Sequence, residues 1–154
     1  MRDNIEIAHE YLLKSVDKGI CSGYFYLGVM AIEGIYPKKD VELGVDYLIR
    51  GAAANNAYCY YYLALLYQEG KYVDKNPKLE FNYLKRAAEE GFIFMQYNLG
   101  IAYYKGQVCK KNDRLALAWL REASRNGYSP SYLLSGDILY EGNVAGLPYD
   151  RAVE

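Results

Sequence analysis

A glycine returns at a fixed interval of 36 residues along most of this 154-residue chain. The recurring positions are Gly34, Gly70, Gly106 and Gly142. Two further sets of positions keep the same interval, namely small residues at Gly28, Ala64, Gly100 and Gly136 and aromatic residues at Tyr11, Tyr47, Tyr83 and Trp119. A period of this length is typical of repeat proteins, in which each unit buries its apolar surface by stacking on its neighbours. The chain is therefore expected to fold as a linear array of about four repeats.

Each repeat contains two segments with the apolar spacing of a helix. In the second repeat, the apolar residues between 43 and 52 share one helical face, and Asn55 is expected to end that helix. A second apolar stripe covers residues 59–67 and is closed by Gly70. Glycine and asparagine accept the left-handed backbone that a helix C-cap needs. The unit is therefore predicted to be a helix, a tight turn, a second helix and a short loop.

These signals predict an all-α fold, a right-handed α-solenoid of about four 36-residue helix-turn-helix repeats in one domain spanning residues 1–154. The predicted repeats cover residues 5–40, 41–76, 77–112 and 113–148, and residues 149–154 are the start of a fifth. An array that ends within a repeat leaves an apolar face open. We therefore expect a fragment of a longer protein, an edge covered by a partner, or end-to-end self-association, of which a fragment is the most economical.

The small and aromatic columns have an expected role in helix packing. Little or no side chain at positions such as Gly28 and Gly100 should let the two helices of a repeat approach closely. The aromatic column is expected to fill the wedge between those helices.

The third repeat carries the fullest motif, Tyr83-Leu-Lys-Arg-Ala-Ala-Glu-Glu-Gly91 followed by Gln96-Tyr-Asn-Leu-Gly-Ile-Ala-Tyr-Tyr-Lys-Gly106. An aromatic residue, paired alanines, a glycine, Tyr-x-Leu-Gly and a closing glycine resemble the Sel1-like repeat, a relative of the tetratricopeptide repeat. The resemblance covers nearly all of residues 5–146. The sequence departs from the family pattern at Ser15-Val16, Asn55, Tyr36, Tyr72 and Val108.

This resemblance implies a non-enzymatic protein-protein interaction module that binds a protein or peptide on the solenoid surface as an adaptor, scaffold or regulator. Some members of the family neutralise secreted toxins, so an inhibitor or immunity-type partner of a toxin is the alternative. An alternative of another class is a β-lactam-type binding protein or hydrolase, as discussed for some cysteine-rich members. This chain lacks the paired cysteines of those members.

Composition and motifs argue against other classes of function. The chain has 18 Lys and Arg against 19 Asp and Glu, so it lacks the net positive charge that would attract nucleic acid or an anionic membrane. Neither a signal peptide nor a membrane span is recognisable, which predicts a cytoplasmic location. His9 is the only histidine, and Cys21, Cys59 and Cys109 lack the spacing of a metal site. We therefore predict no enzymatic activity, no cofactor and no metal.

The first helices of the repeats supply one candidate binding surface. Tetratricopeptide-like solenoids bind partners along a concave surface lined by these helices, and the resemblance implies the same surface here. The candidate residues share the inner face of the first helices: Leu13, Val45, Ile49, Phe81, Lys85, Leu117 and Arg121. The alternative is that the column His9, Val45, Phe81 and Leu117 only completes the packing between neighbouring first helices.

Tyrosines of the second helices supply the other candidate surface. The third repeat has Gln96 and Asn98 at two positions that are expected to face water. Other repeats place tyrosines in these two columns, at Tyr24, Tyr26, Tyr60, Tyr62 and Tyr132. Exposed tyrosines give large contact area at small entropic cost, as in protein interfaces. The alternative is an aromatic-rich composition, with 19 tyrosines in the chain, and no partner for them.

Overall fold

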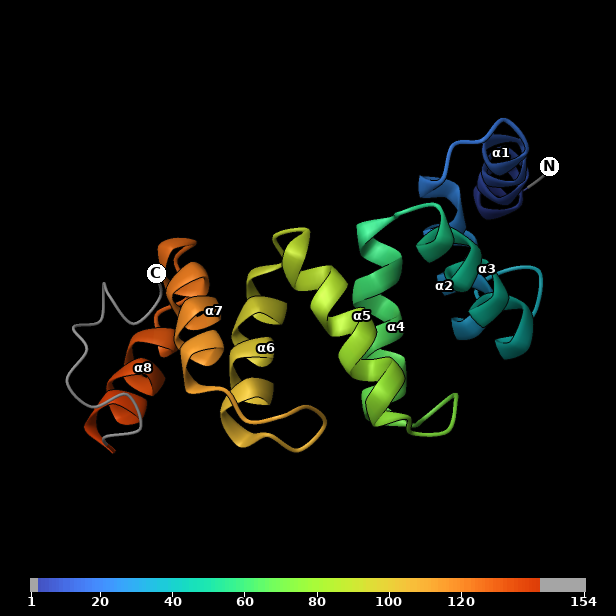
Figure 1. Cartoon of the computed structure of the whole chain (residues 1–154). Coiled ribbons are helices and arrows are strands. Elements are labelled where there is room, and N and C mark those ends of the chain that lie inside the picture. Colours follow the sequence, from blue (N-terminus) through green and yellow to red (C-terminus); the bar gives the residue numbers. More distant parts are fainter. Residues whose placement is uncertain (1–2, 142–154) are drawn as a thin grey trace. The chain divides into compact units, whose positions relative to one another are not determined.

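The computed structural model describes residues 3–141, and within that range the chain consists of eight helices and no strand (Figure 1). The helices are α1 (Asn4–Asp17), α2 (Ser22–Glu33), α3 (Val41–Ala53), α4 (Ala57–Glu69), α5 (Pro77–Glu89), α6 (Ile93–Lys105), α7 (Asp113–Arg125) and α8 (Pro130–Tyr140). The predicted all-α fold and the alternation of first and second helices are confirmed in this range. Gly142, the end of the predicted repeat 113–148 and the start of a fifth repeat at 149–154 lie outside the described residues.

The helices end where the sequence indicates. Gly34, Gly70 and Gly106 follow α2, α4 and α6 with φ values of 72°, 67° and 64°. This left-handed backbone stops a helix and is strained for residues with a Cβ atom. Asn55, after α3, adopts it as well with φ of 58°, a conformation that asparagine tolerates.

Two first helices begin with a side-chain cap. The side chain of Asp40 accepts a hydrogen bond from the backbone N–H of Leu43, and that of Asn112 accepts one from Leu115, both at 3.0 Å. These bonds satisfy donors that have no partner within the helix.

We expect Asn112→Ala to lower the free energy of unfolding by about 1 kcal/mol, because α7 loses this cap. Urea denaturation followed by circular dichroism measures the loss. Asn112→Asp keeps a capping oxygen and should retain most of the stability. An equal loss in both variants would contradict the assigned role of the cap.

By their internal contacts, the helices group into two compact units, Met1–Asn76 and Pro77–Glu154. Within the described residues, unit 1 holds α1 to α4 and unit 2 holds α5 to α8. In unit 1 the most extensive helix contact joins α2 and α3, and in unit 2 it joins α6 and α7. The tightest packing thus lies between the second helix of one predicted repeat and the first helix of the next.

The column of small residues explains these close contacts. A Cβ atom at Gly28 of α2 would lie 2.7 Å from Cγ of Leu48 in α3, and one at Gly100 of α6 would lie 2.8 Å from Cγ of Leu120 in α7. Both leucines are fully buried. The expectation that this column brings together the two helices of one repeat is therefore wrong, because the glycine receives a leucine from the following repeat.

The aromatic column also differs from the expectation. Tyr11 is 67% exposed, and Tyr47, Tyr83 and Trp119 are only partly buried. Aliphatic side chains fill the core instead, among them Leu27, Ile32 and Leu63 in unit 1 and Met95, Leu99 and Ile138 in unit 2. The aromatic column therefore remains accessible on the first helices and is available to line a binding site.

Candidate binding surfaces

The first-helix candidates divide between surface and core. Leu117 is fully buried and packs with Ala116, Leu120 and Ile138 in the core of unit 2. It cannot contact a partner directly, because the facing helix covers it. Phe81 is partly buried, with its ring centre 5.8 Å from that of Tyr103 on α6.

The remaining first-helix candidates keep some solvent exposure. Ile49 and Lys85 are exposed, whereas Leu13, Val45 and Arg121 are partly buried. His9 is partly buried, with its ring 5.2 Å from that of Tyr36 in an edge-to-face arrangement. The column that starts at His9 therefore contributes largely to packing, while Ile49, Lys85 and Arg121 belong to the accessible part of the first helices.

The column at positions 24, 60, 96 and 132 was predicted to face water, but only Tyr132 does so among these four residues. Tyr60 is 4% exposed and Gln96 is 3% exposed. Tyr24 is partly buried, with its ring centre 6.4 Å from that of Tyr47 on α3. Tyr132 is 64% exposed, although it occupies the same column. The next first helix covers positions 24 and 96, which the period of the sequence alone does not show.

The second tyrosine column does contribute to a surface, on α2 and α4 of unit 1. The ring of Phe25 lies among those of three tyrosines. Its ring centre is 5.3 Å from that of Tyr26, 5.5 Å from that of Tyr58 and 6.0 Å from that of Tyr62. Tyr26 and Tyr58 are 55% and 58% exposed, while Phe25 and Tyr62 are partly buried. We refer to Phe25, Tyr26, Tyr58 and Tyr62 as the α2/α4 aromatic cluster.

A polar network borders this cluster. The hydroxyl of Tyr62 donates to Oε1 of Glu33 at 3.2 Å, and the hydroxyl of Tyr72 donates to Oε2 of the same carboxylate at 3.3 Å. Burial and then the Glu33 carboxylate raise the pKa of Tyr62 to about 12, so its hydroxyl stays protonated and able to donate. The ammonium groups of Lys39 and Lys71 each lie 4.6 Å from the centre of the Tyr72 ring.

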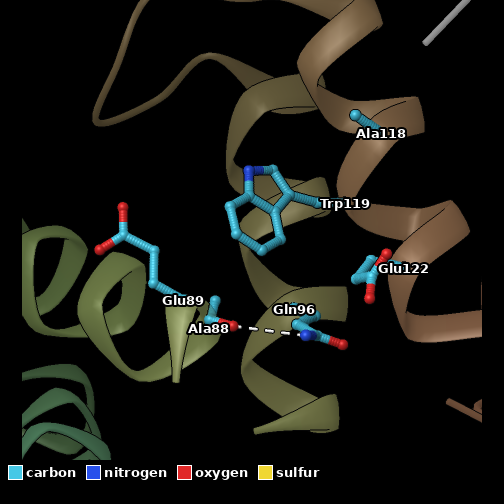
Figure 2. Close-up of a pocket in the computed structure, with 6 residues that line it drawn as sticks. All are labelled: Ala88, Glu89, Gln96, Ala118, Trp119 and Glu122. Carbon is cyan, nitrogen blue, oxygen red and sulfur yellow. Dashed lines mark hydrogen bonds between the residues drawn. The ribbon is translucent and has the colours of Figure 1, made fainter. Parts of the chain in front are cut away.

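A pocket lies in unit 2, between α5 and α7 and above α6 (Figure 2). Its volume is about 370 Å³, and its lining residues are Ala88, Glu89, Gln96, Ala118, Trp119 and Glu122. Figure 2 shows the indole ring of Trp119 projecting from α7 into the space between the two helices. We refer to this feature as the Trp119 pocket.

Hydrogen bonds hold Gln96 at the base of the Trp119 pocket. Its Nε2 donates to the carbonyl oxygen of Ala88 at 3.3 Å, and its Oε1 accepts from Nδ2 of Asn126 at 3.0 Å. The equivalent position in unit 1, 72 residues earlier, is Tyr24, whose ring packs toward Tyr47. The amide is smaller than a phenol ring, which leaves room above it.

The sequence analysis missed the Trp119 pocket because it assigned the column of Trp119 to the wedge between two packed helices. One signal was present in the sequence. Gln96 stands in a column that is otherwise tyrosine, and Trp119 stands in a column that is otherwise tyrosine. The third and fourth repeats therefore combine two departures that meet at one place in the fold.

The repeats match the model of a known family. The Sel1 repeat model matches residues 2–20, 21–56, 57–92 and 93–128. The chain belongs to the Sel1 repeat family. The first match contains α1 alone, and the three full-length matches begin with the second helices α2, α4 and α6. These matches are half a unit out of phase with the repeats predicted from the sequence and have the same period.

Solved Sel1-like structures share this fold. The chain is 27% identical to a Sel1 repeat protein from Oxalobacter formigenes, covering 83% of this chain and 96% of that one with a TM-score of 0.76. It is 26% identical to c5321, a protective antigen present in uropathogenic Escherichia coli strains that displays an SLR fold. That match covers 92% of this chain and 29% of c5321, with a TM-score of 0.75. No curated protein matches this chain.

A third solved structure shows the fold alone. Helicobacter pylori cysteine rich protein B (hcpB) is 20% identical, with 85% of this chain and 94% of that chain covered and a TM-score of 0.62. The Sel1 repeat chain described here is thus an α-solenoid, and Sel1 repeat proteins are generally modules of protein interaction.

The cysteines and acidic side chains of this Sel1 repeat chain are the groups that could react or bind a metal. The three cysteines are free thiols, and burial raises the pKa of Cys59 to about 12, so this thiol is protonated at neutral pH. Within residues 3–141, no group of three His, Cys, Asp or Glu side chains has the arrangement of a metal site. None of the helices in this range is long and apolar enough to cross a membrane.

Proposed function

We propose that this Sel1 repeat chain is a non-enzymatic protein-binding module that docks a partner protein on the α2/α4 aromatic cluster of unit 1. The observation that carries the proposal is the arrangement of Tyr26 and Tyr58 around Phe25. Two tyrosines that are each more than half exposed contact a partly buried ring between them. A role as adaptor, scaffold or regulator follows from such a docking surface.

The physical argument rests on the cost of ordering side chains in an interface. Aromatic side chains bury a large area but lose few rotatable bonds, and contacts among the rings already restrict them before a partner binds. Tyrosine also keeps a hydroxyl that can bond to the partner at the rim. These properties make tyrosine one of the residue types that dominate binding energy in protein interfaces.

The border of the cluster supports the same proposal. Glu33, Tyr72, Lys39 and Lys71 place both signs of charge and several hydrogen-bond donors beside the aromatic rings. An apolar centre with a polar rim is the usual anatomy of a protein interface. A partner with an apolar patch and mixed charges at its edge would complement this surface.

The test is a double substitution, Tyr26→Ser with Tyr58→Ser, in the whole chain. Both side chains are exposed, so helicity and thermal stability should stay close to those of the wild type. We expect the affinity for a captured partner to fall at least about 30-fold, since truncating a hot-spot tyrosine at the centre of an interface costs about 2 kcal/mol or more. Quantitative affinity capture from the native cell, followed by titration of the protein that is recovered, provides the measurement.

A matched control distinguishes the two helix faces. Tyr11→Ser removes a tyrosine that is also more than half exposed but lies on a first helix of the same unit. It should leave partner binding unchanged. If the double variant binds normally and Tyr11→Ser does not, the partner occupies the first-helix surface and the proposal is wrong.

No observation in residues 3–141 specifically favours the inhibitor of a secreted toxin or the β-lactam-binding protein over a general interaction module. The cytoplasmic location stays a prediction from the sequence.

A further inference from the structure

The Trp119 pocket is large enough to hold one side chain of a partner protein. Its volume of about 370 Å³ lies within the usual range for sites that hold small groups. Ala88 and Ala118 contribute walls with short side chains, and the indole of Trp119 contributes a flat aromatic face. Planar groups stack well on such a face.

The electrostatics of the pocket favour a positive guest. Glu89 and Glu122 place carboxylates on opposite sides of the indole ring (Figure 2). Glu89 is the last residue of α5, and Glu122 lies in the last turn of α7. The C-terminal end of a helix carries a partial negative charge that stabilises nearby cations, so the two helix ends reinforce the two carboxylates.

The amide of Gln96, at the base of the pocket, can form more hydrogen bonds than it does. Gln96 is 3% exposed, yet within residues 3–141 its amide makes only two hydrogen bonds, to Ala88 and Asn126. A glutamine amide has two N–H donors and two acceptor lone pairs. One donor and one lone pair of Gln96 are therefore uncommitted, and buried polar groups are normally satisfied by a partner. A guest with N–H groups would satisfy the free lone pair.

The cations of the protein itself hold these carboxylates only loosely. Nζ of Lys85 lies 3.9 Å from Glu89, and Nη1 of Arg125 lies 4.0 Å from Glu122, both at the outer limit of an ion pair. All four side chains are at least 40% exposed, so these pairs are weak in water. A guest cation that enters the pocket can replace them at little cost.

Unit 1 lacks this arrangement at the equivalent positions. Residues 72 positions earlier place Tyr24 where unit 2 has Gln96, and Arg50 where it has Glu122. Arg50 forms an ion pair with Asp46 at 2.8 Å. Asp17 keeps a carboxylate where unit 2 has Glu89. The smaller side chain of Gln96 and the second carboxylate, Glu122, therefore distinguish unit 2 and do not follow from the repeat itself.

We propose that the Trp119 pocket binds an arginine side chain of a protein partner. The guanidinium stacks on the indole of Trp119, and its N–H groups donate to Glu89, Glu122 and Oε1 of Gln96. Guanidinium is preferred over ammonium because it is planar, stacks on aromatic faces and carries five N–H donors in a fixed geometry.

The experiment uses three short peptides with blocked ends, in which glycine flanks a central arginine, lysine or citrulline. Trp119 is the only tryptophan, so its fluorescence and its single indole N–H resonance report on the pocket directly. We expect the arginine peptide to give a saturable change. The citrulline peptide, which keeps the shape but loses the charge, should bind at least about tenfold more weakly, because both ion pairs and the cation–π contact are lost. Added salt should weaken arginine binding.

Variants define the residues involved. Glu122→Gln should weaken arginine binding about fivefold, and Gln96→Tyr should abolish it by placing the side chain found at position 24 into the pocket. Glu90→Gln changes the carboxylate that directly follows α5 and does not line the pocket, so it is the matched control and should bind normally. Circular dichroism of each variant verifies the fold.

Equal binding of the citrulline and arginine peptides would overturn the proposal, as would equal binding of the lysine peptide or the absence of a saturable response. The α2/α4 aromatic cluster belongs to unit 1, and its test uses other substitutions and a protein partner. The two proposals can therefore fail independently.

Discussion

Gly100→Leu is expected to lower the free energy of unfolding by about 1 to 3 kcal/mol, because α6 and α7 are already in contact at this residue. Even a Cβ atom would lie 2.8 Å from Cγ of Leu120 and 3.2 Å from the carbonyl oxygen of Ala116. A backbone oxygen cannot rotate away as a side chain can. Leucine has a better helix propensity than glycine by up to about 1 kcal/mol, which offsets only part of the overlap.

Gly136→Leu is the matched control for this prediction. Gly136 occupies the same column of the repeat, but a Cβ atom there would meet no heavy atom within 4 Å. Without overlap, helix propensity should leave this variant as stable as the wild type or slightly more stable. Urea denaturation followed by circular dichroism measures both variants. Equal destabilisation at the two positions would show that the role of this column does not depend on contact with a following helix.

Tyr60→Ala is expected to lower the free energy of unfolding by about 3 to 5 kcal/mol, the range for removing a buried aromatic ring. Tyr60 is 4% exposed, and its hydroxyl donates to Oδ1 of Asn55 at 2.9 Å. Asn55 holds the left-handed turn between α3 and α4, so the same bond also stabilises the turn. Tyr60→Phe should lose about 1 kcal/mol, since it removes this bond and keeps the ring.

Tyr132→Ala is the control in the same column. Tyr132 is 64% exposed, so the change should stay within about 0.5 kcal/mol. Thermal and urea denaturation provide the measurement. A similar loss in the two variants would mean that Tyr60 does not belong to the core of unit 1.

The burial of Tyr60 also changes how binding should be tested. From the sequence, Tyr24, Tyr60 and Tyr132 are all expected to face water, so a triple substitution of these residues would be the natural test of binding. The structure indicates that such a variant would lose stability through Tyr60, and a loss of binding would then have no clear meaning. Tyr26 and Tyr58 can be changed without this complication, because both lie on the surface of unit 1.

The helices themselves could be predicted from local residues. Helix ends need a residue that accepts a positive φ, such as Gly34 or Asn55, and helix starts need a capping oxygen, such as that of Asn112. Both requirements act within one turn of the helix, so the residue type at that position reveals them. The family could be predicted as well, because its motif is a set of such local features at a fixed period. The prediction was weaker for side chains, since the period does not show which helix lies over a given face.

The candidate surfaces show this difference residue by residue. The exposure of Tyr26 agrees with the prediction for its column, whereas Tyr60 was expected to face water and lies in the core. Leu117 was a candidate for the binding surface with packing as the alternative, and it lies in the core. The Trp119 pocket was not predicted, because it requires Glu89 of α5, Gln96 of α6 and Trp119 of α7 to meet. Three helices contribute to it, and no single helix contains its pattern.

The sequence by itself determined the all-α repeat, its period, most helix ends and membership of the Sel1 repeat family, because these depend on backbone conformation and on spacing along the chain. The tertiary structure alone decided which members of a column are buried. Gly100 and Gly136 share a column, as do Gln96 and Tyr132, yet in each pair the first is covered by α7 and the second is open to solvent. Burial depends on the neighbouring helix, and a residue's own position in the repeat does not contain that information.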